Sequence, residues 1–497
     1  MMRTFFIICS FLVIEMIRVC GSVAAQYNEY ETAKLREFLM QESAERGVWN
    51  FQQLGLTSIN DISWGEIPGL RWSYPTWRLL SLEWPHLKLS GHLDVSDFQE
   101  LRDLYCSFNE IDAVTVHNCP ALINMDFYTN NLTEVDITTI PNVRFLRLGY
   151  NNIRNVDMSG NPYLMFFCCS NNQVEMLDFS NKELIETIYC IGNELHTLIV
   201  DNCIKLETLL CSQNALTNMN LHNLPSLTAF SCFNNSLYNL QFLNCPLLVE
   251  IDCSENELPV LDVSACESLT NLNCSNNQLA SINMAGCNNL TTVNCKNNLL
   301  VSLDISNAPA LSTLNCSFNF FSFLTLPPNK PPLKSYTYAP QSNISLTCKP
   351  NDVDLSDYYN AGGYISSFIW RNRHTVVTPL ENNEGRFVFD ESYIGDSLTC
   401  YVRNNFLPVL WLQFDVKFTE DGDSGNVNPA MEGLTVYAGE QAIHVTTATP
   451  ATVCIYSLQG ALHQKKTVYA GYTRIPIERG IYVAVVNDTI SYKLIVR

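Results

Sequence analysis

Basic residues are scarce in this chain of 497 residues. Lysine and arginine number 29 against 49 aspartates and glutamates, so the formal net charge is −20. Nucleic acids and anionic membranes attract clustered positive charge, and the composition therefore argues against both as partners. Long apolar runs are missing as well. Beyond the N-terminus, no stretch of sequence is long enough to form a transmembrane helix.

Residues that would indicate catalysis or a metal site are also few. The 8 histidines are scattered, and none belongs to a catalytic motif. An enzyme needs a nucleophile, a base and an orienting group that converge in one pocket. The 20 cysteines include no C-x-x-C pair with a matching second set of ligands, as a zinc site would need. We therefore expect no catalysis, no metal and no cofactor.

The dominant feature of the chain is a repeat with a period of 21 residues. Apolar residues lie five and two positions before a reference column, as Leu101 and Leu104 do before Cys106. In the eleven units from Cys106 on, an asparagine follows the column by three residues: Asn109, Asn130, Asn151, Asn172, Asn193, Asn214, Asn235, Asn256, Asn277, Asn298 and Asn319. Nine of the eleven column residues are cysteine, namely Cys106, Cys169, Cys190, Cys211, Cys232, Cys253, Cys274, Cys295 and Cys316.

This pattern predicts a leucine-rich-repeat solenoid, an α/β horseshoe built on one parallel β-sheet. The L-x-C segment is expected to be a short strand, and the asparagine amide to bond backbone groups that the following turn leaves open. The repeat is short, so the opposite side should consist of turns rather than long helices. Neighbouring cysteines of the ladder lie one strand apart, somewhat too far for a disulfide, and we expect buried, reduced thiols.

The N-terminus has the pattern of a secretory signal peptide over residues 1–25: Arg3, an apolar run, and a small-residue cleavage site ending at Ala25. A lipoprotein attached through Cys20 is the alternative. Residues 26–84 hold an amphipathic helix and five of the seven tryptophans. A solenoid exposes its core at each end, so this segment is predicted to be a cap; an aromatic ligand site is the alternative. The repeats are expected to fill residues 85–330, up to a proline-rich linker.

Residues 333–420 are rich in strand-forming sequence. Cys348, Trp370 and Cys400 stand in an arrangement that resembles an immunoglobulin-like domain. The resemblance implies a sandwich of two sheets with a disulfide between Cys348 and Cys400. Two unpaired core cysteines are the alternative. A polar linker is predicted over 421–430; its similarity to a serine-protease loop and to a calcium loop is too incomplete to indicate either site.

Residues 431–497 are predicted to form a small β domain that ends in the strands Gly480–Val486 and Tyr492–Val496. Their motifs, order and terminal position resemble the C-terminal sorting domain of the type IX secretion system of Bacteroidetes. The resemblance implies export across the outer membrane of a Gram-negative bacterium and attachment to the cell surface, with the secretion machinery as a partner. An ordinary β domain is the alternative.

The 21-residue period and the cysteine and asparagine columns, between a cap and an immunoglobulin-like module, are similar to internalin-J-like proteins. Internalins are bacterial surface proteins with adhesive roles in virulence, so the resemblance implies protein binding without catalysis. The chain lacks the L-P-x-T-G wall anchor of the Gram-positive members. The expected partner is a host receptor, a bacterial surface protein or a glycan.

Residues beside the cysteine column should point out of the sheet, onto a concave face. In the early repeats this set is rich in aromatic residues and includes one arginine, a composition typical of binding hot spots. The candidate binding residues are Tyr105, Phe108, Tyr128, Phe145, Arg147, Tyr150, Phe166 and Tyr189. The alternative is that these rings pack only against one another or the cap. A structural role, in a biofilm or surface layer through self-association, is the rival function.

Overall fold

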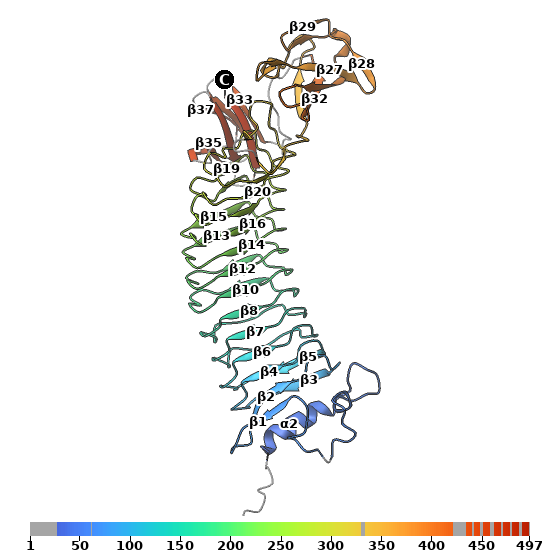
Figure 1. Cartoon of the computed structure of the whole chain (residues 1–497), viewed down its shortest axis with the longest axis vertical. Helices are drawn as coiled ribbons and strands as arrows, with labels where there is room; N and C mark the ends of the chain where they lie inside the picture. Colours follow the sequence, from blue (N-terminus) through green and yellow to red (C-terminus); the bar gives the residue numbers. More distant parts are fainter. Residues whose placement is uncertain are drawn as a thin grey trace, which may run out of the picture. The chain divides into compact units, whose positions relative to one another are not determined.

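The computed structural model describes residues 27–60, 62–329 and 333–420, and strands between 434 and 496. The predicted signal peptide (1–25) and polar linker (421–430) lie outside these residues. The chain divides into two compact units, Met1–Leu177 and Asp178–Arg497. Figure 1 labels the elements of both units along the chain.

The first unit begins with two helices, α2 (Glu29–Leu39) and α3 (Asn50–Gln53). The side chain of Asn28 caps α2 by accepting a hydrogen bond from the amide of Glu31, at 3.1 Å. Leu35 and Leu39 are fully buried on one face of the helix, and the ring of Phe38 stacks on that of Trp84 at 6.1 Å. Trp84 itself is fully buried. The segment therefore covers the apolar end of the repeat core.

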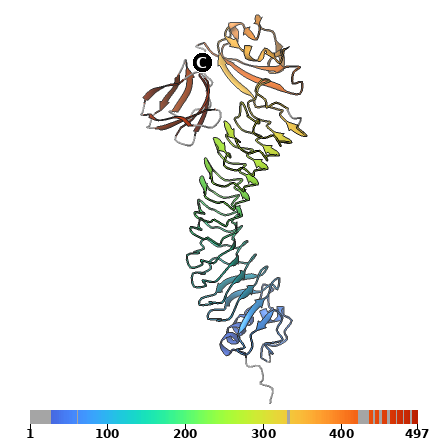
Figure 2. The same ribbon diagram turned by 60° about the vertical axis from the view of Figure 1, so that its left-hand side comes forward.

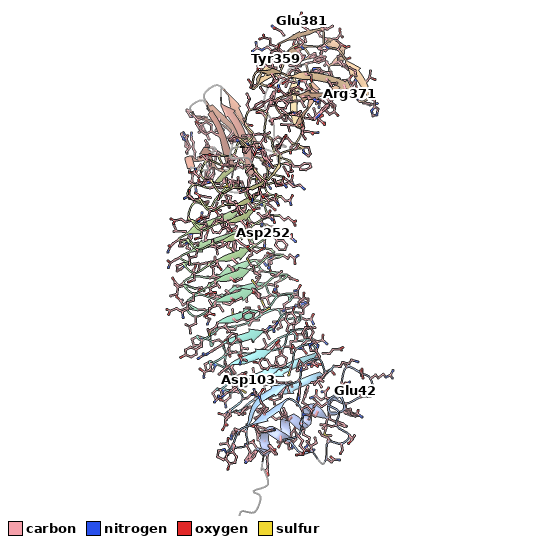
Figure 3. All side chains as sticks on the ribbon, in the orientation of Figure 1. Glu42, Asp103, Asp252, Tyr359, Arg371 and Glu381 are labelled. Carbon is pink, nitrogen blue, oxygen red and sulfur yellow. The ribbon has the colours of Figure 1, made fainter. Side chains whose placement is uncertain are left out.

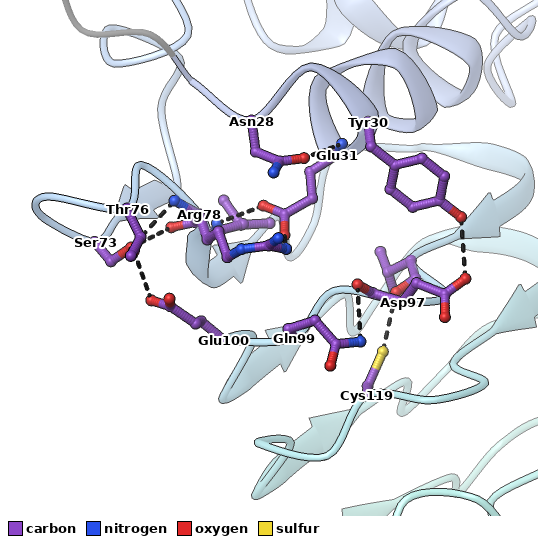
Figure 4. Close-up of polar contacts among 12 residues, drawn as sticks. Asn28, Tyr30, Glu31, Ser73, Thr76, Arg78, Asp97, Gln99, Glu100 and Cys119 are labelled. Carbon is purple, nitrogen blue, oxygen red and sulfur yellow. Dashed lines mark hydrogen bonds and ion pairs between the residues drawn. The ribbon is translucent and has the colours of Figure 1, made fainter.

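A buried carboxylate fastens this cap to the first long strand (Figure 4). Glu31 accepts a hydrogen bond from the amide of Leu79 at 2.7 Å and forms an ion pair with Arg78 at 3.1 Å. Burial raises the pKa of the Glu31 carboxyl, although the bonds from Leu79 and Arg78 oppose this. The contact joins residues that lie almost fifty positions apart in the sequence.

The repeats of the first unit build one sheet, whose strands follow each other in the order β1, β2, β4, β6, β7 and β8 (Figure 1, Figure 2). After the antiparallel pair β1–β2, all pairs are parallel. Leu104, Met125 and Leu146 align in register because the apolar pattern recurs every 21 residues. The bounds are β1 (Leu70–Trp72), β2 (Leu79–Glu83), β4 (Asp103–Tyr105), β6 (Asn124–Asp126), β7 (Phe145–Arg147) and β8 (Phe166–Cys168).

The second unit repeats the same construction. Its strands are parallel and in register, as Leu209, Phe230 and Ile251 show. From β10 to β21 the middle residue of each strand is buried and its neighbours are at least partly exposed, so one side of the sheet faces the core; in β22 the middle residue, Tyr336, is half-buried. The strands are β10 (Thr187–Tyr189), β12 (Thr208–Leu210), β14 (Ala229–Ser231), β16 (Glu250–Asp252), β18 (Asn271–Asn273), β20 (Thr292–Asn294), β21 (Thr313–Asn315) and β22 (Ser335–Thr337).

The opposite side of the repeats consists of turns, as the short repeat predicts, and of further short strands, so the α/β description of the predicted fold does not apply to the described repeats. Among the described residues, the repeats contain no helix; α2 and α3 belong to the cap. A 21-residue turn that spends three residues on one strand and several on two bends leaves too little chain for a helix. The back strands are β3 (Ser90–Asp94), β5 (Glu110–Thr115), β9 (Met176–Asp178), β11 (Thr197–Ile199), β13 (Asn218–His222), β15 (Asn239–Leu243), β17 (Val260–Asp262) and β19 (Ser281–Asn283).

The asparagine column satisfies the backbone at the turn after each strand. Asn130 donates from Nδ2 to the carbonyls of Cys106 (2.9 Å) and Phe127 (3.2 Å) and accepts at Oδ1 from the amide of Ile111 (3.0 Å). The geometry recurs along the column. After the last asparagine, Gln341 takes the same position, donating to the carbonyl of Cys316 at 3.1 Å. The longer glutamine side chain serves a final turn that is one residue longer.

The ladder cysteines are buried and free of disulfides, where the period places them. Burial raises the pKa of their thiols, that of Cys211 to about 12, so they stay protonated and unreactive at neutral pH. A second column of cysteines, to which Cys119 belongs, has a different role. Cys119 donates from Sγ to the carbonyl of Val95 at 3.0 Å, as Asn161 does from Nδ2 to Ile137 at 2.9 Å.

Residues 333–420 form a mixed five-stranded sheet in the order β23, β32, β31, β27, β28, and a three-stranded sheet in the order β24, β30, β29. Trp370 on β27 packs against Phe387 on β30 at 5.1 Å, so the two sheets share a core. The elements are β23 (Ile344–Cys348), β24 (Val353–Asp354), η1 (Ser356–Tyr358), β25 (Asn360–Ala361), β26 (Tyr364–Ile365), β27 (Ser367–Asn372), β28 (Thr375–Val377), β29 (Glu381–Asn383), β30 (Arg386–Val388), η2 (Glu391–Tyr393), β31 (Ser397–Arg403) and β32 (Trp411–Phe418).

The predicted disulfide between Cys348 and Cys400 does not form, and both thiols are free and buried. Cys348 on β23 and Cys400 on β31 belong to the same sheet, with β32 between them. Two strand spacings amount to about 10 Å, beyond the roughly 7 Å between Cα atoms that a disulfide can bridge. Cys348 lies opposite Phe418 of β32, whereas Cys400 lies opposite Phe414 of the same strand. The sequence spacing was misleading because it does not report which sheet a strand joins.

The C-terminal strands form two antiparallel sheets, in the orders β33, β34, β37 and β36, β35, β38, β39. The two strands that carry the sorting-domain resemblance, β38 and β39, pair with each other. The bounds are β33 (Leu434–Gly439), β34 (Ala442–Thr447), β35 (Ala451–Ser457), β36 (Leu462–Val468), β37 (Gly471–Pro476), β38 (Gly480–Val486) and β39 (Ile490–Val496).

Candidate functional site

The predicted binding residues separate into two groups in the first unit. Tyr105, Phe145 and Arg147 lie on the strands of the long sheet, as expected. Phe108, Tyr128 and Tyr150 instead lie in the turns that follow the strands, so their placement on the strands was wrong. The remaining two predicted residues are half-buried on strands: Phe166 pairs in register with Phe145, whereas Tyr189 belongs to β10 in the second unit and is no part of this site.

The strand residues surround a shallow hollow of about 280 Å³, which is lined by Tyr105, Asn124, Met125, Asp126, Phe145 and Arg147. Phe145 is 44% exposed although it is apolar. Arg147 forms an ion pair with Asp126 at 3.1 Å, and the amide of Tyr128 donates to the same carboxylate at 2.9 Å. These bonds hold the polar groups of the hollow in place before any ligand arrives.

Four aromatic rings follow one another along the turns and form what we call the aromatic row: His86, Phe108, Tyr128 and Tyr150. Successive ring centroids are 4.2, 5.6 and 5.2 Å apart. Arg147 lies over the ring of Tyr128 at 5.2 Å and so connects the row to the hollow. The rings pack against one another, as the alternative interpretation expected, yet Phe108 and Tyr150 remain 44% and 50% exposed.

The backbone under the row is strained. His86, Phe108 and Tyr150 have φ values of 57°, 57° and 55°, in the left-handed region. That conformation costs about 1–2 kcal/mol for most residues other than glycine, and asparagine tolerates it best. The same turn position elsewhere holds Asn171 or Asn276. Exposed aromatic rings at such positions stabilise neither the turn nor the core, which indicates a role outside folding.

Gly149 makes the row continuous. A Cβ atom at this position would lie 2.8 Å from Cε2 of Tyr128, so only glycine leaves room for the ring. Tyr128 thereby fills the gap between Phe108 and Tyr150, where the turn position itself is occupied by Thr129. Sequence analysis missed Gly149, His86 and the carboxylate of Asp126. The aromatic identity of turn positions that usually hold asparagine was the available signal.

The second unit has a hollow of its own, of about 490 Å³, around Asp252. Asp103 and Asp252 mark the sheets of the two units in Figure 3. Asp252 accepts a hydrogen bond from Asn273 at 3.1 Å, where Asp126 in the first unit has Arg147. Phe230, the aromatic residue of this second hollow, is buried. The second hollow therefore lacks the exposed rings that distinguish the first.

Within the described residues, no group of histidine, cysteine, aspartate and glutamate side chains is arranged to hold a metal ion. No helix in that part of the chain is both long and apolar enough to cross a membrane.

No protein-family model matches the sequence, and no curated protein matches it. Similar solved structures include the functional domain of InlJ from Listeria monocytogenes, which includes a cysteine ladder: 18% identity, 69% of this chain and 93% of that chain covered, TM-score 0.40. Another is the leucine-rich effector protein YopM from Yersinia pestis, with 22% identity, 50% of this chain and 83% of that chain covered, and a TM-score of 0.36. A third is PEPR1–AtPEP1, with 16% identity, 67% of this chain and 54% of that chain covered, and a TM-score of 0.48. At these values the similarity assigns no function, and we infer function from this chain's own residues.

Proposed function

We propose that this chain is a secreted adhesion protein of a Gram-negative bacterial surface, and that it binds its partner through the aromatic row and the adjoining hollow. The partner is a protein or a glycan on a host cell or a neighbouring bacterium. The observation that carries this proposal is the set of exposed aromatic rings held on left-handed backbone at His86, Phe108 and Tyr150.

Export and attachment follow from the sequence motifs. The N-terminal apolar segment with its cleavage site supports secretion, and the motifs of β38 and β39 support type IX secretion followed by surface attachment. The immunoglobulin-like sandwich proposed for 333–420 would serve as a spacer between the repeats and the cell. It has no disulfide, so its stability depends on the core around Trp370.

The test compares adhesion of beads coated with the full chain to epithelial cells and to bacterial cells. The variant Tyr128→Ser/Phe145→Ser/Tyr150→Ser removes two exposed rings and the half-buried ring of Tyr128, and it should abolish adhesion without unfolding the chain. Phe318→Ser is the matched control, because Phe318 is 39% exposed at an equivalent turn position, φ 55°, outside the row. Equal adhesion by both variants would refute the proposal. Concentration-dependent self-association of the free chain, unaffected by the triple variant, would favour the structural role instead.

A further inference from the structure

The acids around the hollow lie beside arginines. Arg147 pairs with Asp126 at 3.1 Å, and Arg71 lies 3.3 Å from both Asp103 and Glu83. Each acid thus has an arginine within ion-pair distance, with Arg71 shared between two carboxylates. A charged ligand would have to displace one of these pairs, whereas a neutral ligand can keep them all. The site therefore fits an uncharged ligand.

The site offers flat apolar rings on one side and fixed planar polar groups on the other. Asn124 donates from Nδ2 to Asp103 at 2.6 Å, and Asp126 and Arg147 hold each other. Donors and acceptors thus stand side by side at the edge of the rings. A matching ligand has one apolar face and a rim of groups that both donate and accept hydrogen bonds.

A peptide backbone matches this surface poorly. An extended peptide carries one donor and one acceptor per residue, and they need partners when they are covered. The strands of the long sheet have their own backbone groups committed to neighbours on both sides, for example β6 between β4 and β7, so a peptide cannot add to them as a strand. Phe108 carries no polar side-chain group, each tyrosine of the row supplies one hydroxyl, and His86 supplies two ring nitrogens at most.

We propose that the aromatic row and the hollow bind a neutral oligosaccharide of pyranose units. This inference rests on the proposed function and names the partner's chemistry. The apolar C–H faces of the sugar units would lie against the exposed parts of Phe108, Phe145 and Tyr150, and hydroxyl groups would bond Asn124, Asp126 and Arg147.

The first experiment titrates the full chain, by calorimetry, with β-1,4-linked oligomers of glucose and of N-acetylglucosamine that are two to six units long; a wider array of neutral and sialylated glycans serves as the survey. We expect saturable binding that tightens with length over the first few units and then levels off. We also expect little change between low and high salt, because the ligand carries no charge. Absence of binding to every neutral glycan overturns the proposal, as does binding that salt abolishes.

Variants locate the site. Tyr128→Ser should weaken saccharide binding by about tenfold, the scale of a hot-spot residue, and Phe318→Ser should leave it unchanged. Gly149→Ala keeps all four rings but displaces that of Tyr128, so it should also weaken binding. Circular dichroism confirms that each variant is folded. Equal affinities for Gly149→Ala, Tyr128→Ser and the unaltered chain would show that the row does not bind the saccharide.

A last comparison separates failure of this inference from failure of the proposed function. Target cells are treated with periodate, which cleaves vicinal diols of sugars, or with protease. Adhesion through the row should be lost after periodate and survive protease treatment. Adhesion that depends on Tyr128 but is lost only after protease treatment overturns the saccharide and leaves the adhesive function standing. Adhesion that Tyr128→Ser does not change overturns both.

Discussion

Replacing one asparagine of the ladder tests how the repeat is held together. Asn298 is 3% exposed, and its Oδ1 accepts the amide of Leu279 at 2.9 Å. Its Nδ2 donates to the carbonyls of Cys274 at 3.0 Å and Cys295 at 3.1 Å. The change Asn298→Ala removes these bonds, and a longer one from Nδ2 to the carbonyl of Lys296 at 3.3 Å, at a position that water cannot easily reach. The repeat should therefore open locally at this turn.

The magnitude follows from which groups keep a partner. The two carbonyls also accept bonds from the neighbouring ladder amides, Asn277 to Cys274 at 3.2 Å and Asn319 to Cys295 at 3.0 Å. The amide of Leu279 loses its side-chain acceptor. An orphaned buried group costs about 1–3 kcal/mol and each lost bond about 0.5–1.5 kcal/mol, which together give a destabilisation of about 3 kcal/mol.

Native-state hydrogen exchange measures this cost locally, which matters because a solenoid need not unfold as one unit. Faster exchange is expected for the turn around Leu279 and its nearest repeats. Asn289→Ala is the matched control, since Asn289 is exposed and makes one bond, to the carbonyl of Glu267 at 3.3 Å. Asn298→Asp keeps the acceptor but sets a carboxylate against two carbonyls, so it should be at least as unstable at pH 7 and recover on acidification. Equal exchange in the two alanine variants would refute the reasoning.

Three further predictions concern the cap, the ladder and the following module. The pKa of the Glu31 carboxyl is raised in the folded state, so its contribution to cap stability is complete below the unfolded-state pKa and is lost as pH rises through the folded-state pKa. Denaturation followed by tryptophan fluorescence should show this fall of stability with rising pH, and Glu31→Gln should remove it. Cys232→Ser should destabilise the repeats more than Cys232→Ala, by about 1–3 kcal/mol, because it buries a hydroxyl in an apolar column; urea denaturation of the two variants decides. A reducing agent should leave the melting temperature of the chain unchanged, since Cys348 and Cys400 form no disulfide.

Much of the fold could be predicted because the period of a repeat determines which residues of neighbouring units align. Every unit of the sequence places one apolar residue in the middle of a strand and one asparagine at the following turn, as Met125 and Asn130 do. Parallel stacking then aligns equal positions of neighbouring units. The burial of the ladder thiols could be predicted from the same periodicity, because a residue that has apolar neighbours in every unit is shielded from solvent.

The sequence pattern is less informative where the repeat ends or bends. The back of the repeats holds turns, as predicted, and also short strands such as β13 and β15 that pair with each other and that the sequence pattern did not indicate. Cys348 and Cys400 had a suitable spacing for a disulfide, but sheet membership, which depends on strands distant in the sequence, put β32 between them.

For the candidate site, the sequence by itself determined that aromatic residues gather in the early repeats. Only the tertiary structure decided how they act together. It placed Phe108 and Tyr150 on strained turns, seated Tyr128 over Gly149, and joined Arg147 to Asp126 beside the hollow. The physical reason is that side chains 21 residues apart become neighbours only when the strands stack at a spacing of about 4.8 Å.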